Sequence, residues 1–186
     1  MNFQEAKKKQ LSKSDKSSIG KWDSKIRGLC EKMNKKKEYY TTSSCAGRIV
    51  LIKDVEKKVE NVFLFRTHKK ISFNEIKRAL SDVGKKYKKM VEFQQSTCIL
   101  HVGCASLVDA QGLVNKAKLT GWKHSGIMTS NKRFVVELHS TEKISFPIMN
   151  LGKILVNDDF LKIIVKQANE KLERTWGKIE KFSKAL

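Results

Sequence analysis

The sequence predicts an α+β fold: a single domain, residues 1–186, in which a mixed, largely antiparallel sheet is flanked by helices. Three observations predict it. Apolar residues recur at helical spacing over 21–34 and from Asp158 onward. Short runs rich in aromatic and β-branched residues lie between these two segments. Ser72 and Ser106 each stand three residues before an acidic residue, the signature of a capped helix start.

The elements follow in order along the chain. A basic helical segment is expected over 1–38 and a long C-terminal helix over 158–183. Two further helices begin after the serine caps, and Gly121 ends the second of them. The expected strands cover residues 39–44, 48–53, 61–67, 96–102, 122–129, 133–139 and 143–148.

Two groups of these strands have an expected pairing. Polar residues after Asp54 indicate a turn, so 48–53 and 61–67 are expected to form a hairpin. The last three strands are expected to form an antiparallel meander, with turns at Ser130-Asn131 and Ser140-Thr141. No glycine-rich turn follows the first strand, which argues against a doubly wound Rossmann scaffold.

The chain is strongly basic, with 39 Lys and Arg against 19 Asp and Glu and a formal net charge of +20. Residues 1–40 hold 12 basic and 5 acidic residues, and 69–89 hold 8 and 2. This clustered surplus favours a polyanionic partner, either nucleic acid or an anionic membrane surface. The alternative is that the lysine runs are solvated faces.

The first residues lack the apolar stretch of a signal peptide, and the longest apolar runs are too short to span a membrane. We therefore expect a cytoplasmic protein.

The four cysteines, Cys30, Cys45, Cys98 and Cys104, form no CxxC pair and have no disulfide-framework spacing. They are interpreted as free, buried thiols. His101 and Cys104 stand close in sequence, but no second pair of ligands completes a tetrahedron, so no metal site is expected.

The most unusual segment is 41–48, TTSSCAGR, in which four hydroxyls precede Gly47 and Arg48 at a junction between strands. Small donors, a permissive backbone and a fixed cation suit the binding of a carboxylate, a phosphate or a ribose. The alternative is a Ser/Thr-rich turn with a surface arginine. Neither GxxxxGK[ST] nor GxGxxG is present, so no known phosphate loop is indicated.

Four histidines, His68, His101, His124 and His139, lie at or near the ends of expected strands. A base that works near neutral pH is a histidine or a perturbed carboxylate, so they are candidate bases. The alternative is that each is a hydrogen-bonded structural residue.

The segment 121–126, GWKHSG, places an aromatic ring and a cation between two glycines. This pattern suits a stacked base or adenine ring, and equally a helix C-cap that leads into a strand.

Several of these residues, taken in order, closely resemble the wybutosine-synthesising N-methyltransferases of tRNA. The resemblance covers nearly the whole chain and is clearest from about Tyr39 to Ile148. The residues that carry it are Ser43–Ile49, His68, Ile99–Val102, Ala110-Gln111, Ala117–Gly121 and His124–Ile127.

This resemblance implies an S-adenosyl-L-methionine-dependent methyltransferase that acts on the tricyclic, wyosine-type guanine beside the anticodon of phenylalanine tRNA. It also implies a fold unlike the Rossmann scaffold of most methyltransferases. The preferred wyosine intermediate and the oligomeric state stay open.

The resemblance also implies roles for individual residues. Ser44, Gly47 and Arg48 match the family's serine–glycine–arginine motif, and His68 and His101 match its two downstream histidines. We expect the cofactor to be bound by Ser43, Ser44, Gly47 and Arg48. Arg48 would pair with a carboxylate of the cofactor or of the substrate.

His68 or His101 is the expected base, and the RNA is expected at Trp122, Lys123, His124 and Ser125. In this interpretation the flipped base stacks on Trp122. The alternative function is a non-enzymatic, basic RNA- or DNA-binding protein, which explains the net charge equally well. It leaves segment 41–48 and the strand-end histidines without a role.

Overall fold

The computed structural model describes residues 2–13, 23–55, 61–129 and 133–186. Over these ranges the chain forms five helices and nine strands, and every strand pair is antiparallel. The residues divide into two compact units. Unit 1 comprises Met1–Ala46, Thr97–Thr141 and Thr175–Leu186, and unit 2 comprises Gly47–Ser96 and Glu142–Arg174.

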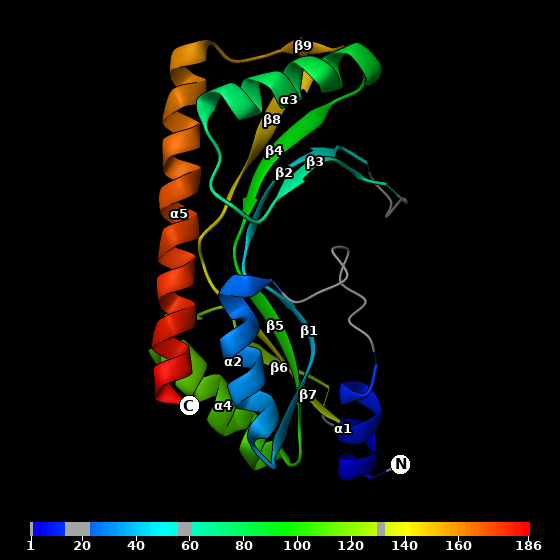
Figure 1. The fold of residues 1–186 in the computed structure, drawn as a ribbon, viewed down its shortest axis with the longest axis vertical. Helices are drawn as coiled ribbons and strands as arrows, with labels where there is room; N and C mark the ends of the chain where they lie inside the picture. Colours follow the sequence, from blue (N-terminus) through cyan, green and yellow to red (C-terminus); the bar gives the residue numbers. More distant parts are fainter. Residues whose placement is uncertain (1, 14–22, 56–60, 130–132) are drawn as a thin grey trace. The chain divides into compact units, whose positions relative to one another are not determined.

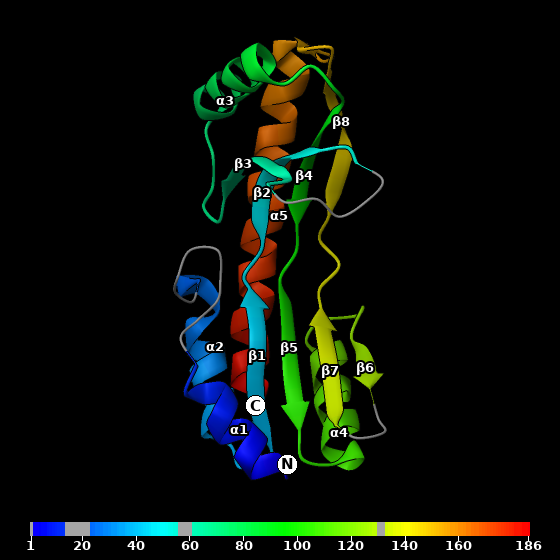
Figure 2. The ribbon, with the colours of Figure 1, turned by 90° about the vertical axis from the view of Figure 1, so that its right-hand side faces the viewer.

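Unit 1 contains a four-stranded sheet in the order β1-β5-β7-β6, whose strands lie side by side in Figure 2. Its strands are β1 (Tyr39–Cys45), β5 (Ile99–Cys104), β7 (Phe134–His139) and β6 (Gly126–Thr129). Its helices are α1 (Phe3–Leu11), α2 (Ser24–Lys35), α4 (Leu107–Leu119) and the last turns of α5 (Asp158–Ala185).

The core of unit 1 lies on one face of this sheet. Because side chains alternate along a strand, Leu100 and Val102 of β5 point into it together with Val136 and Leu138 of β7. Apolar residues of α2, α4 and the end of α5 cover that face. Helix α1 lies against the opposite face, where the Phe3 ring packs on Tyr40 (Figure 1). We call this opposite face, which lies away from the core, the open face of the unit 1 sheet.

Unit 2 contains a five-stranded sheet in the order β3-β2-β4-β8-β9. Its strands are β2 (Arg48–Lys53), β3 (Phe63–Thr67), β4 (Val91–Ser96), β8 (Ile144–Asn150) and β9 (Lys153–Ile154). Helix α3 (Phe73–Lys86) and the first part of α5 belong to the same unit. Ser72 caps α3, and Asn169 of α5 hydrogen-bonds to both backbone groups of Ile71.

The expected α+β class, the 48–53/61–67 hairpin and the helices after Ser72 and Ser106 are confirmed. The expected single sheet is instead two sheets, which no strand pair connects over the described residues. The expected meander is wrong at its third strand, because β8 pairs with β4 of unit 2 instead of β7. The expected turn at Ser140-Thr141 is instead the point after which the chain passes from unit 1 into unit 2. The expected turn at Ser130-Asn131 lies outside the described residues.

The single domain over 1–186 stays a prediction. Its expected subdivisions agree with the helices, since α1 and α2 fall within 1–38 and α5 begins at Asp158. Over the described residues, no helix has the length and apolar character that crossing a membrane requires.

Candidate functional site

Three polar side chains meet on the open face of the unit 1 sheet, one from each of β1, β5 and β7. Ser43 pairs with His101 across β1 and β5, and His101 pairs with Glu137 across β5 and β7. Ser43 Oγ lies 2.6 Å from His101 Nδ1, and His101 Nε2 lies 2.8 Å from Glu137 Oε2. We call these three residues the relay.

A β-bulge in β1 brings Ser43 to this face. The register of β1 against β5 shifts between Thr41 and Ser43, so that Thr41 is buried while Ser43 is exposed. Asn34 of α2 fixes the start of the bulge: its side-chain oxygen accepts from the Thr41 N–H at 2.7 Å, and its amide donates to Thr41 Oγ1 at 3.0 Å. A bulge commonly re-aims a side chain in this way.

The relay has a defined direction for protons. Because an ionised carboxylate only accepts hydrogen bonds, the His101 tautomer that pairs with one donates from Nε2 to Glu137, and its Nδ1 then accepts from Ser43 Oγ. The His101 side chain is 25% exposed and that of Glu137 35%, and Ser43 is exposed. A hydroxyl, an imidazole and a carboxylate in series form an arrangement that can carry a proton from the hydroxyl to the imidazole.

Sequence reasoning found two members of the relay and missed the third. Glu137 lies between Val136 and Leu138, both buried in the core. A single carboxylate alternating with buried aliphatic residues in a strand was the available signal. Its pairing with His101 depends on which strands are neighbours, and only the structure supplies that.

The remaining residues of segment 43–48 divide between the two units. Ser44 belongs to β1 of unit 1, while Gly47 and Arg48 belong to unit 2. Gly47 has φ 99°, a left-handed conformation that favours glycine. The Arg48 guanidinium lies 4.8 Å from the centroid of the Phe63 ring. A cation held over a ring face in this way is attracted by the negative face of the ring.

His68 follows β3 in unit 2 and is half-buried. The structure thus brings Ser43 and His101 together, whereas His68, Gly47 and Arg48 belong to the other unit.

The predicted RNA contacts at 122–125 divide into two kinds. Trp122 is 0% exposed: its Nε1 donates to the Lys178 carbonyl at 3.1 Å and its ring lies 5.4 Å from that of Phe182. Stacking of a base on Trp122 is therefore wrong. The reason is local, because Gly121 adopts φ 96° after α4 and the chain then turns into the core.

Ser125 is also unsuited to RNA contact. It is 6% exposed, and its hydroxyl donates to the Trp122 carbonyl and accepts from the His139 N–H. Lys123 and His124 are exposed, and the His124 ring stacks on that of His139 with 6.4 Å between centroids. Only Lys123 and His124 stay predictions for RNA contact.

Two buried thiols of the unit 1 core, Cys98 and Cys104, are not candidate nucleophiles. Burial raises the pKa of Cys98 and of Cys104 to about 12. Burial also raises the pKa of the Tyr39 phenol to about 12, and neighbouring Cys104 and Asp109 add to the shift. These groups are therefore neutral at physiological pH, and the polar chemistry of this unit lies with the relay.

The family follows from comparison with known sequences. Residues 4–186 match the family model described as "Methyltransferase TYW3". The chain belongs to this family. One relative, from Thermococcus sibiricus, is named tRNA(Phe) 7-((3-amino-3-carboxypropyl)-4-demethylwyosine(37)-N(4))-methyltransferase. It is 39% identical over 97% of this chain and 92% of its own length. A tRNA wybutosine-synthesizing protein 3 homolog of Danio rerio is 33% identical over 100% of this chain and 74% of its own length.

Solved structures agree with the sequence comparison. The PH1069 protein of Pyrococcus horikoshii superposes with a TM-score of 0.87 at 34% identity, over 98% of this chain and 93% of that one. A protein of Aeropyrum pernix superposes with a TM-score of 0.75 at 27% identity, over 87% and 95%. The family resemblance of the sequence is confirmed, and the chain is an enzyme of the methyltransferase class.

Proposed function

We propose that this chain is a cytoplasmic methyltransferase that transfers a methyl group from S-adenosyl-L-methionine to a ring nitrogen of the demethylwyosine-type base in phenylalanine tRNA. The names of its relatives support the substrate. The observation that carries the mechanism is the relay, an exposed serine hydroxyl backed by an imidazole and a carboxylate.

The residues of segment 43–48 fit S-adenosyl-L-methionine by the chemistry of their donors. The cofactor has an α-carboxylate and ribose hydroxyls, which require N–H and O–H donors. Ser44 offers a hydroxyl, and Arg48, held over the Phe63 ring, offers guanidinium N–H groups of the kind that pair with carboxylates. When bound, the cofactor supplies an electrophilic methyl group on a sulfonium.

The relay handles the proton that must leave the acceptor. The proton that the acceptor nitrogen loses on methylation would pass to Ser43 Oγ, and the proton of Ser43 would pass to His101 Nδ1. Glu137 accepts from Nε2 and stabilises the resulting imidazolium. A positioned base of this kind contributes about 10²–10⁴-fold. Holding the acceptor in line with the methyl group contributes a further ~7–11 kcal/mol.

His68 stays a second candidate base. It lies in unit 2, outside the relay. Comparing His68→Gln with His101→Gln therefore separates the two candidates, because the relay mechanism requires a rate loss only at His101.

The test is methyl transfer to phenylalanine tRNA that carries the unmethylated tricyclic base, followed by mass analysis of the digested nucleosides. We expect the wild-type chain with S-adenosyl-L-methionine to add one methyl group to that base. Binding of the tRNA without any transfer, and without calorimetric binding of the cofactor, would establish a basic RNA-binding protein instead.

Glu137→Gln tests the relay within that assay. The amide keeps the size of the side chain and an acceptor oxygen but removes the charge that stabilises the imidazolium. Since a hydrogen bond to a charged group contributes about 1.5–3 kcal/mol, kcat should fall by about 10–150-fold. The KM for tRNA should not change. A rise in KM with kcat unchanged would show that Glu137 contributes to binding alone.

A further inference from the structure

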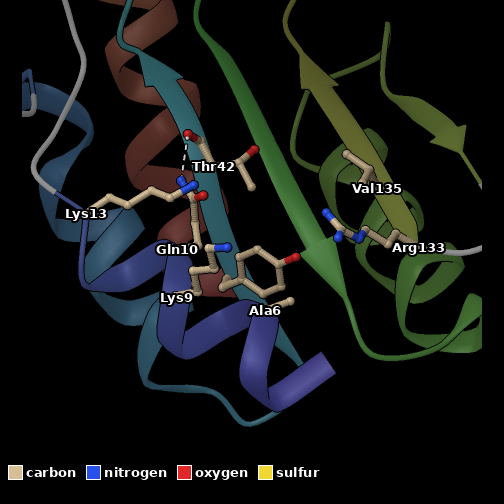
Figure 3. A pocket seen from close by; sticks show the side chains of 8 residues that line it. Ala6, Lys9, Gln10, Lys13, Thr42, Arg133 and Val135 are labelled. Carbon is tan, nitrogen blue, oxygen red and sulfur yellow. Dashed lines mark hydrogen bonds between the residues drawn. The ribbon is translucent and has the colours of Figure 1, made fainter. Parts of the chain in front are cut away.

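A second polar site lies on the open face of the unit 1 sheet, beside the relay. A pocket of about 250 Å³ opens between α1 and the sheet (Figure 3). Its cations come from both sides: Lys9 from α1, Lys13 from the residues after α1, and Arg133 from the residue just before β7. We call it the basic pocket.

The basic pocket has the composition of an anion site. None of its eight lining residues is acidic. Figure 3 shows Arg133 reaching from the β7 side toward α1, while Lys9 and Lys13 reach from α1 toward the sheet. Three like charges directed into one concave, partly apolar pocket focus a positive potential there, which a bound anion neutralises. Gln10 and Thr42 add polar atoms to the wall.

The position of α1 is fixed by contacts to β1 and to the end of α2. The Phe3 ring lies 5.3 Å from that of Tyr40, the Lys7 ammonium donates to the Lys36 carbonyl, and Gln10 Nε2 donates to the Thr42 carbonyl at 3.4 Å. Lys7 is partly buried by this docking, and that burial lowers its pKa. The pocket is therefore part of the fold of unit 1.

The basic pocket and the relay are neighbours on the same face. Thr42 of the pocket precedes Ser43 of the relay, and Val135 of the pocket is two residues from Glu137 on β7. Two residues of a strand span about 7 Å. A nucleotide whose base reaches Ser43 thus has its own phosphate, or that of its neighbour, within reach of the pocket.

We infer that the basic pocket binds a backbone phosphate of the RNA strand whose base is presented to the relay. This inference rests on the proposed function and names the contact that aligns its substrate. Lys9 and Arg133 neutralise the phosphate from opposite sides, and Lys13 adds a third charge. Phosphate contacts of this kind fix the register of a nucleic acid without reading its sequence.

The variants are Lys9→Ala, Arg133→Ala and the double variant, and the matched control is Lys8→Ala. Lys8 is an exposed lysine of the same helix, next to Lys9, and does not line the pocket. Each single change removes one positive charge from unit 1, so a general electrostatic effect is the same for Lys8 and Lys9. The measurement is the affinity for phenylalanine tRNA between 50 and 200 mM salt.

Each neutralised phosphate contributes about 0.7–0.9 to the slope of log affinity against log salt, so the double variant should lose about that much slope. Over this range the wild type should then lose about threefold more affinity than the double variant. Lys8→Ala should keep the wild-type slope. The inference is overturned if Lys8→Ala and the pocket variants have the same slope.

Calorimetry with S-adenosyl-L-methionine separates the other source of an anion. If the pocket held the cofactor carboxylate, cofactor affinity would fall in the pocket variants while the salt slope for tRNA stayed unchanged, and the inference would be wrong. The methyl-transfer assay of the wild type distinguishes the two failures. A wild type that binds tRNA through the pocket but transfers no methyl group contradicts the proposed function alone.

Discussion

Replacement of Trp122 should destabilise the fold without weakening RNA binding. The indole is 0% exposed, donates a hydrogen bond to the Lys178 carbonyl and packs on Phe182. It therefore joins the segment after α4 to the last turns of α5. A residue with these contacts contributes to packing and cannot offer a face to a base.

The magnitude follows from those contacts. Trp122→Ala removes the whole ring from a close-packed core, at a cost of about 3–5 kcal/mol. Trp122→Phe keeps one ring and loses the hydrogen bond, about 0.5–1.5 kcal/mol, together with part of the buried apolar area. We expect about 2 kcal/mol for Trp122→Phe, small enough for a folded protein with a typical stability of about 5–15 kcal/mol.

The assay combines two readouts on Trp122→Phe. Urea unfolding should shift to a lower midpoint, while tRNA affinity, measured well below that midpoint, should equal that of the wild type. Removing the ring from under a stacked base costs about 1–3 kcal/mol in affinity, and Trp122→Phe, which keeps one ring, would lose a part of that. A variant with wild-type unfolding and a reduced tRNA affinity would refute the burial argument.

Three more outcomes depend on particular contacts. Gly103→Ala should lower the melting temperature, at a cost of about 1–3 kcal/mol, because a Cβ there would lie 2.6 Å from Tyr40 Cε1; an unchanged melt would show that Tyr40 moves freely. Ser72→Ala should cost about 1 kcal/mol in urea unfolding, because Ser72 caps α3, and an unchanged midpoint would contradict that role. Burial raises the pKa of Cys98 and Cys104 from 9.0 to about 12, so their contribution to stability is complete below pH 9 and is lost as pH rises toward 12. Urea midpoints measured across that range should fall with pH, and a flat series would contradict the assignment.

Local patterns predicted most elements because each depends on a few adjacent residues. The serine caps of α3 and α4 and the β2–β3 hairpin fall within a residue or two of their expected positions. Strand β4 was missed because Gln94 and Gln95 interrupt its apolar pattern, although Gln95 is buried in the structure. Tertiary burial overrides β-propensity in such a strand.

The pairing of strands that lie far apart in the sequence could not be predicted in the same way. β7 and β8 follow each other in the sequence, yet they pair with strands of different sheets. For the same reason, the sequence did not predict that Glu137 belongs to the candidate site. His101 was recognisable as a strand-end histidine, but its contact with Glu137 spans 36 residues of sequence. Trp122 was misassigned because a tryptophan between glycines has the same local pattern whether the chain turns inward or outward.

The relay is the central claim, and single-turnover methyl transfer by His101→Gln tests it most directly. The assay uses phenylalanine tRNA with the unmethylated base, saturating S-adenosyl-L-methionine, and Lys8→Ala as the control. With base catalysis lost, the rate should fall by about 10²–10⁴-fold while cofactor and tRNA affinities stay unchanged. Transfer by His101→Gln at the wild-type rate would show that the proton leaves by another route and would contradict the mechanism.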